Sequence, residues 1–385
     1  MNTVVYLLAA SGGYSVQARD ADSGKVRWTG KAWNPPPPME GSQGDANLGE
    51  PAEIPEVSTV RQGGEEYVVV SAHGMEGKDD LHEGKEVVRL AVFPTDTSGT
   101  GVAPLREISV PVDAKMGSLR VTGTDGGLLV KWTALFNEHH SASVNVTTGK
   151  VRQHGNADAL LPQCEAMVEC NGSQVATMTE TGPLVSLGGG GFGMPDRWLS
   201  KDVTPPGVSK EQGVLGSWNG TVVAVSGDHV LASWTTGKYG DGTPVWSIHD
   251  IRTGRVKASM SCSTETKAGK ADDPGSLIVS PGGRFLASGS VAFDTTTRKG
   301  TCLAGDGDRK AMAVASITKN GTAYGVVTEG TDDDDSVVVE VPLSGGRPRS
   351  IGAGVDIPMQ PLDRAGLFMT RNSTGQVVVS VRAKS

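Results

Sequence analysis

The chain has 385 residues, 20% of them charged, and a formal net charge of −8, with the basic residues scattered singly. Because a nucleic-acid backbone is bound by clustered lysine and arginine, this distribution argues against nucleic-acid binding. The 53 glycines and 21 prolines, beside only 5% aromatic residues, predict a chain rich in turns whose core is built mainly from valine and alanine.

The chain opens with a short apolar run from Val4 to Ala10. This run is too short to cross a bilayer or to form a standard signal-peptide core, and no basic flank precedes it. We therefore predict a β-strand that begins at Thr3 and no membrane span in this chain. A targeting segment or an anchor upstream of Met1 stays open.

The first strand leads into a phrase that occurs three times, at residues 14–28, 143–152 and 245–257. Each copy reads as an alternating segment, a polar turn with glycine at a fixed place, a lysine or arginine, a valine and a second segment. Glycine supplies the positive backbone angle that a tight hairpin turn needs. A hairpin that recurs cannot bury its own apolar face, so the copies must stack on one another, as in a propeller or a β-array.

Looser copies of the phrase occupy residues 88–99, 291–299, 337–347 and 367–381. Gly149 and Gly254 lie 105 residues apart, which corresponds to two repeats of about 50 residues, the length of a four-stranded blade. We therefore predict an all-β fold: a single β-propeller domain over residues 1–385, with about seven four-stranded blades, or eight because residues 155–215 are hard to parse.

A closed ring needs both termini to complete its last blade, since an edge strand would otherwise stay open. The strand that begins at Thr3 and the strand at Gln376–Val381 are the candidates for this closure. The pattern does not decide how many strands each terminus contributes.

Three segments do not fit the repeat and are predicted to be long loops: residues 31–56, which contain the run Pro35–Pro38, residues 186–212 and residues 262–275. In propellers, such loops usually carry the binding residues, because a rigid scaffold positions them. Tolerated insertions without a role are the alternative.

The four cysteines are Cys164, Cys170, Cys262 and Cys302. The first two lie close enough for a short hairpin to join them, and the other two follow strands of consecutive repeats. Of the three possible pairings we predict disulfides 164–170 and 262–302, with four buried free thiols as the alternative. Disulfides persist in oxidising compartments, so this pattern predicts an extracellular or cell-surface protein, either secreted or anchored.

Three motifs resemble those of known propeller families. Ile248–Val256 is similar to the strand end of WD40-type repeats, Ser280–Ala287 resembles a strand of TolB-like propellers, and Asp20–Trp28 resembles the turn of PQQ-like repeats. The resemblance spans nearly the whole chain and implies a bacterial secreted β-propeller of the PQQ-like or WD40-like (TolB-like) class, although the Trp–Asp pair is mostly absent. It implies no particular activity, because these folds carry many unrelated functions.

No constellation of residues predicts catalysis, cofactor binding or a metal site, and we assign no residue to these roles. The run Gly188–Gly191 lacks the lysine and the helix start of a phosphate loop. Glu138, His139 and His140 have metal-ligand chemistry, but adjacent residues at a hairpin tip point to opposite sides, so we expect a solvated turn. The run Asp332–Asp335 matches no known calcium loop; Ca²⁺ is nevertheless the one cofactor that we keep open.

These observations predict a non-catalytic extracytoplasmic propeller, a sensor, scaffold or interaction domain that recognises a protein, peptide or glycan on one face. The alternative is a propeller enzyme, a glycan lyase or hydrolase with carboxylates from several blades at the channel mouth. A facing carboxylate pair in a central pocket would favour the enzyme. A third hypothesis, a structural assembly subunit, would be favoured by large apolar patches.

Overall fold

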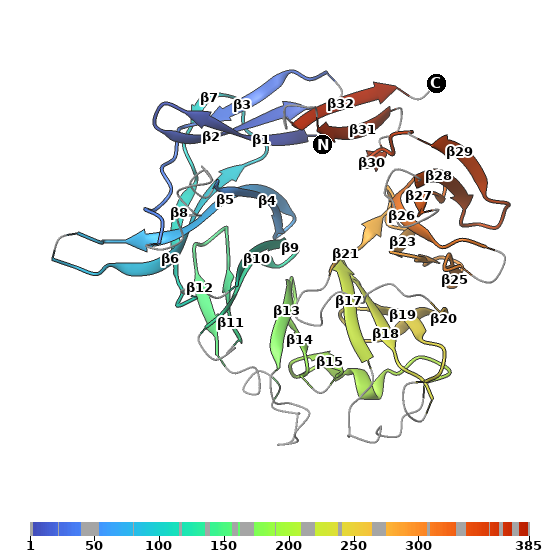
Figure 1. Cartoon of the computed structure of the whole chain (residues 1–385). Helices are drawn as coiled ribbons and strands as arrows, with labels where there is room; N and C mark the ends of the chain where they lie inside the picture. The colour runs from blue at the N-terminus through green and yellow to red at the C-terminus, as the bar shows by residue number, and fades with distance from the viewer. Residues whose placement is uncertain are drawn as a thin grey trace, which may run out of the picture. The chain divides into compact units, whose positions relative to one another are not determined.

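The computed structural model is nearly all β (Figure 1). The structure describes residues 3–39 apart from 22, 54–79, 81–114, 118–134, 139–155, 161, 173–188, 190–208, 220–237, 241–263, 275–305, 309–328, 336–353, 355–361, 365–371 and 377–383. Within these ranges the strands form eight sheets, of which six have four strands, one has five and one has three. This is the strand complement of an eight-bladed β-propeller, the higher of the two predicted blade counts. No helix of the described residues is long and apolar enough to cross a membrane.

The chain divides into two compact units, residues 1–162 with 172–184 and residues 163–171 with 185–385. The first unit holds three complete sheets. The first sheet has the order β1 (Thr3–Ala10), β2 (Gly13–Asp20), β3 (Val26–Gly30), β7 (Gly99–Val102). The second has the order β4 (Glu56–Gln62), β5 (Glu65–Glu76), β6 (Lys85–Pro94), β8 (Arg106–Pro111). The third has the order β12 (Val151–His154), β11 (His139–Val144), β10 (Gly127–Thr133), β9 (Leu119–Thr124).

The fourth sheet runs β13 (Gln174–Thr179), β14 (Gly182–Ser186), β15 (Phe192–Met194), β16 (Trp198–Leu199), and a 3₁₀ turn, Ser200–Asp202, follows it. The fifth runs β20 (Val256–Ser261), β19 (Val245–Asp250), β18 (His229–Trp234), β17 (Gly220–Ser226), β21 (Gly275–Ser276). The sixth runs β22 (Ile278–Val279), β23 (Phe285–Ser288), β24 (Val291–Asp294), β25 (Lys299–Cys302).

The seventh sheet runs β26 (Met312–Ile317), β27 (Thr322–Thr328), β28 (Ser336–Pro342), β29 (Arg349–Ala353), and the last runs β30 (Gln360–Pro361), β31 (Ala365–Arg371), β32 (Val377–Ala383). Most neighbouring strands in these sheets pair antiparallel, as expected when short turns join them. Among the described pairings, β7 runs parallel to β3 and β21 runs parallel to β17. Among the described residues, the strands of the two chain ends belong to different sheets, β1 to the first and β32 to the last.

The recurring phrase folds into the same turn in all three copies. The side chains of Asp20, Asn145 and Asp250 each accept a hydrogen bond from the backbone N–H three residues later, at 2.9, 2.8 and 3.0 Å. The glycine one residue further on adopts a positive φ in every copy: Gly24 (+68°), Gly149 (+77°) and Gly254 (+70°). Its N–H donates to the backbone carbonyl of the Asp or Asn at 2.8 Å. The repeated pattern therefore marks one hairpin turn, closed by an Asp or Asn side chain and a left-handed glycine.

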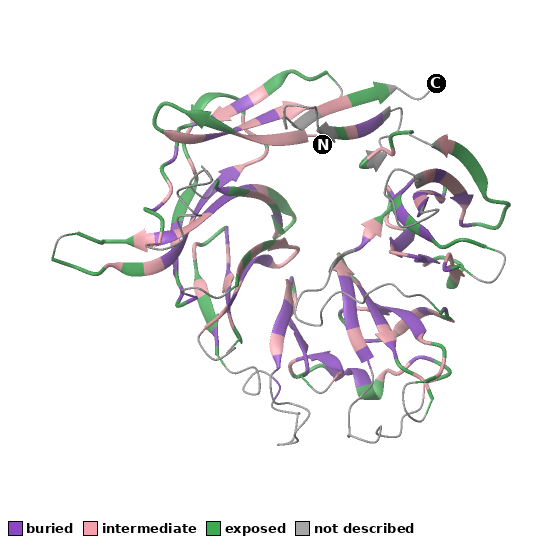
Figure 2. Ribbon diagram, viewed as in Figure 1, coloured by how far each residue is buried: buried purple, intermediate pink, exposed green. Residues whose placement is uncertain are grey.

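Apolar clusters join neighbouring sheets within each unit. Trp28 of the first sheet stacks on Phe93 of the second, with ring centroids 5.9 Å apart, and both are fully buried. Further clusters join the second sheet to the third, the fifth to the sixth and the sixth to the seventh. Figure 2 shows the buried residues along the strands and the exposed residues in the turns between them. Each of these sheets is therefore covered by its neighbour, as the stacking of repeats requires.

The predicted long loops differ in outcome. Residues 31–39 form an extended segment without repetitive structure, apart from one bridge at Trp33. The segment 186–212 was predicted as a loop throughout, which is wrong for its first part because it contains β15, β16 and the 3₁₀ turn. Strands of two or three residues carry too little alternation to be recognised beside a glycine run. Most of the segment 262–275 lies outside the described residues.

Candidate functional site

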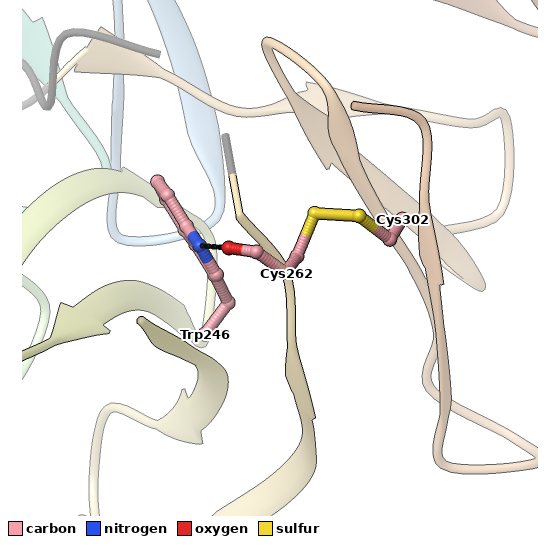
Figure 3. The surroundings of a disulfide bond; sticks show 3 residues. All are labelled: Trp246, Cys262 and Cys302. Carbon is pink, nitrogen blue, oxygen red and sulfur yellow. Dashed lines mark hydrogen bonds between the residues drawn. A yellow bond between two sulfur atoms is a disulfide. The ribbon is translucent and has the colours of Figure 1, made fainter. Parts of the chain in front are cut away.

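Cys262, directly after β20, and Cys302, at the end of β25, form a disulfide (Figure 3). Their Cα atoms lie 5.5 Å apart, and the pairing confirms the prediction for these two cysteines. The indole Nε1–H of Trp246 donates to the Cys262 carbonyl at 3.1 Å. At Gly300 of β25, a Cβ atom would come within 2.4 Å of the Met260 sulfur. The disulfide thus joins closely packed strands of the fifth and sixth sheets. Its buried, hydrogen-bonded surroundings are those of a structural disulfide.

The other predicted residues do not form a site in the described structure. Cys164 and Cys170, and the acidic run Asp332–Asp335, lie outside the described residues. His139 and His140 are the first residues of β11 and not a solvated turn, and the His140 ring stacks on Trp132 with centroids 5.6 Å apart. Within the described ranges, no three His, Cys, Asp or Glu side chains gather in a way that could hold a metal ion.

A hydrogen-bonded chain of polar side chains crosses the core of the fifth sheet. The Trp234 Nε1–H donates to Ser247 Oγ at 2.7 Å, and Ser247 Oγ–H donates to His249 Nε2 at 2.7 Å. His249 Nδ1–H in turn donates to the Gly254 carbonyl at 2.8 Å. Because a carbonyl can only accept, His249 Nδ1 carries a proton, and in the neutral imidazole Nε2 is then left to accept the Ser247 hydroxyl proton.

Burial lowers the pKa of His249 to about 4. Ser247 and His249 are both 0% exposed, so no substrate reaches the serine, although the pair has the composition of a nucleophile and its base. His249 also packs edge-on against Phe192 of β15, with ring centroids 5.6 Å apart. The arrangement fastens the turn at Gly254 to the core and is structural.

The hairpin of β5 and β6 is the most prominent feature that the repeat pattern did not predict. β4 pairs with β5 only as far as Ser71, and β8 pairs with β6 only from Val87. Beyond these positions the ladder between β5 and β6 continues down to Glu76 and Lys85. Figure 1 shows this hairpin extending well past the other strands of its sheet. Its end is exposed, as Figure 2 shows.

A carboxylate organises the tip of this hairpin, which we define as residues 77–79 and 81–84. Asp79 Oδ1 accepts hydrogen bonds from the N–H groups of Leu81 and His82, both at 2.8 Å, and from His82 Nδ1 at 2.7 Å. The bond from the Leu81 N–H, followed by that from the His82 ring, lowers the pKa of Asp79. These bonds hold a turn in which Leu81 is 90% exposed.

Two contacts stiffen the hairpin just before its tip. His73 Nε2 lies 2.8 Å from Glu86 Oε1 across the two strands, and these side chains are only 15% and 9% exposed. The Met75 N–H donates to the Pro37 carbonyl at 2.8 Å. At Gly74 a Cβ atom would lie 2.3 Å from the same oxygen, so only glycine lets the extended segment approach. The predicted proline-rich loop therefore supports the hairpin at this point.

The segment 31–39 also borders two surface recesses of the first unit. The tip recess, of about 610 Å³, is lined by Met39 and Met75 together with the tip residues Lys78, Asp79 and Leu81–Gly84. The Lys31 recess, of about 590 Å³, is lined by residues 31–34 from this segment, by Arg89 of β6 and by Ala103, Pro104 and Glu107 around the start of β8. Residues so far apart in the sequence share no pattern, so only the positions of the strands bring them together.

Comparisons with known proteins add a likeness in fold only. No family model matches this sequence, and no curated protein matches it. Among solved structures, an uncharacterized protein of Listeria monocytogenes is similar over 100% of this chain and 93% of its own, with 7% identity and a TM-score of 0.41. A polysaccharide lyase gives 8% identity and a TM-score of 0.38 over 100% and 88%. TolB of Acinetobacter baumannii gives 10% identity and a TM-score of 0.29 over 100% and 80%. Likeness at this level carries no argument about function.

Proposed function

We propose that this chain is a non-catalytic, extracytoplasmic binding propeller that docks a partner protein with the tip of the β5–β6 hairpin. The observation that carries the proposal is the hydrogen-bonded turn at Asp79, which holds Leu81 in a position where the residue is 90% exposed. An isolated exposed leucine needs no explanation in a disordered loop. Here the leucine lies at the end of a hairpin held by the His73–Glu86 pair and the bond from Met75 to Pro37, so it is positioned to enter a pocket on a partner.

The energetics of such an anchor suit a protein pocket. Burying a leucine side chain contributes about 1.5–3 kcal/mol. Little of this gain is lost to ordering the segment, because Asp79 already holds the turn and the His73–Glu86 pair already joins the strands. A glycan offers no apolar pocket deep enough to bury a leucine side chain. Among the predicted ligands we therefore choose a protein.

The charge of the hairpin indicates the chemistry of the partner. Between Met75 and Glu86 the sequence has five carboxylates against two lysines. A partner that accepts Leu81 in an apolar pocket therefore carries a basic rim, because facing charges of opposite sign speed association and exclude wrong partners. Binding should weaken as salt rises, since exposed charges are screened within about 10 Å at 0.1 M ionic strength.

The location in this proposal is supported by the Cys262–Cys302 disulfide. Such bonds persist in oxidising compartments and are rare in the cytosol. The proposed function thus combines a covalently linked scaffold with one projecting recognition element.

The experiment places a photo-crosslinking residue at position 81 of the full chain and exposes the protein to envelope and extracellular extracts. The matched control carries the same residue at Leu105, which is 56% exposed in the same unit. We expect one protein crosslinked at position 81 and absent from the control. The purified partner should then lose at least about 30-fold in affinity for the Leu81→Asp variant, as expected of an anchor residue.

Equal crosslinking at both positions, or an unchanged affinity of Leu81→Asp for the purified partner, would overturn the docking proposal. Turnover of any glycan by the purified chain, measured as new reducing or unsaturated ends, would overturn its non-catalytic part. The far-UV circular dichroism of each variant shows whether a loss of binding reflects a loss of fold.

A further inference from the structure

We infer that the Lys31 recess is a second binding site, which takes a small ligand bearing one carboxylate group. The site does not depend on the hairpin tip, because it lies at the other end of the segment 31–39. Its chemistry differs from that of the acidic hairpin, since it gathers cationic and amide groups.

The recess is formed where β7 leaves the second sheet to pair with the first. β7 runs parallel to β3, and the Lys31 N–H donates to the Val102 carbonyl at 2.7 Å. This contact places Lys31 next to the connection that leads through Ala103 and Pro104 into β8. Trp33 is fixed by two backbone bonds with Tyr14, at 2.8 and 2.9 Å. The wall of the recess is therefore built on paired backbone, and its shape is preformed.

The charges of the recess favour a single negative charge. Lys31 is exposed and makes no ion pair with any residue of the described structure, whereas Arg89 is paired with Glu107 at 2.5 Å. One ammonium group is thus available to a ligand, while the guanidinium is already neutralised by its carboxylate. A phosphate dianion would be repelled by Glu107 and under-compensated by Lys31, so a carboxylate fits better.

The remaining groups suit the polar atoms of such a ligand. Asn34 offers both a donor and an acceptor, and the Arg89–Glu107 pair offers one of each at the rim. Trp33 also borders the recess, and its buried indole Nε1 has no hydrogen-bond partner in the described structure. A volume of about 590 Å³ accommodates a ligand of the size of a sugar acid or a terminal amino acid.

The test uses two carboxylate probes that stand for the two sources of this chemistry, D-glucuronate for an acidic saccharide and N-acetylglycine for a peptide terminus. The neutral controls are D-glucose and N-acetylglycinamide, and inorganic phosphate is the anion control. Each is titrated into the full chain while the indole N–H resonance of Trp33, assigned with Trp33→Phe, is followed by NMR. We expect a saturable shift with at least one carboxylate probe, and which probe binds identifies the source.

The decisive variant is Lys31→Gln, with Lys25→Gln as the matched control, because Lys25 is an exposed lysine in a turn outside the recess. Loss of one charge-assisted contact should weaken the probe about tenfold in Lys31→Gln and leave Lys25→Gln unchanged. The inference fails if neither carboxylate probe binds, if a neutral analogue or phosphate binds as tightly, or if both lysine variants behave alike. The Leu81→Asp variant should bind the probe normally, which separates this site from the proposed docking site.

Discussion

The disulfide between Cys262 and Cys302 gives a prediction whose size follows from the structure. Replacing both cysteines by alanine removes a covalent link between two positions 40 residues apart in sequence. In the chain-entropy account, closing a loop of that length stabilises the folded state by about 4 kcal/mol. The side chains around the link remain packed, because the cluster of the fifth and sixth sheets contains many other residues. The loss should therefore come mainly from the freed unfolded chain.

The assay is urea denaturation of the wild-type chain and the Cys262→Ala/Cys302→Ala variant without reductant, followed by tryptophan fluorescence. We expect a stability loss of about 4 kcal/mol, or a fall of roughly 10 °C in the melting temperature of the unit that carries the bond. Each single variant should lose nearly as much as the double variant, because either change breaks the same bond. A free energy of unfolding for the double variant that lies within about 1 kcal/mol of the wild-type value would refute the reasoning.

Three further predictions test the turns and the buried network. Since the pKa of His249 is lowered to about 4, the unfolded chain binds a proton below pH 6.5 that the folded chain refuses. The contribution of His249 to the free energy of unfolding should thus be complete above pH 6.5 and fall by roughly 3 kcal/mol as the pH drops to 4. In denaturation curves recorded across this range, His249→Gln should depend less on pH than wild type. An equal dependence in both proteins would contradict the prediction. Arg298 occupies a left-handed conformation with φ of 59°, so Arg298→Gly should raise stability by about 0.5–1 kcal/mol, whereas a loss on urea denaturation would argue against strain there. Gly254→Ala would bring a Cβ within 2.6 Å of the Trp198 ring, whereas Gly24→Ala at nearly the same φ meets nothing within 4 Å. We expect losses of about 3 and 1 kcal/mol, and equal losses in urea would show that the ring does not set the difference.

The sequence predicted the repeated hairpin because that information is local. An Asp or Asn, a Gly four residues later and a following Lys or Arg occur together in each copy, and the turn needs only these neighbours. The pairing of Cys262 with Cys302 followed from the same repeat, since both residues end equivalent strands. Stacking of the sheets then followed from the need of each hairpin to bury its apolar face.

The candidate sites could not be predicted in this way. The Lys31 recess joins residues 31–34 to Arg89 and Glu107, and their proximity depends on the strand β7, whose sequence Gly-Thr-Gly-Val looks like a loop. The hairpin tip did carry a local signal, because Asp79 precedes Leu81 and His82 in a turn-like segment between two valine-rich strands. What separates this hairpin from the others is the 12-residue length of β5, which only the structure shows.

The crossing of β7 from one sheet to its neighbour has a consequence for how such a chain can change in evolution. The outer strand of the first sheet is encoded after β6, within the stretch of gene that also encodes the second sheet. A recombination event that removed the second sheet would also delete β7. One that removed the first sheet would leave β7 without the strand with which it pairs. We therefore expect these two sheets to be inherited together.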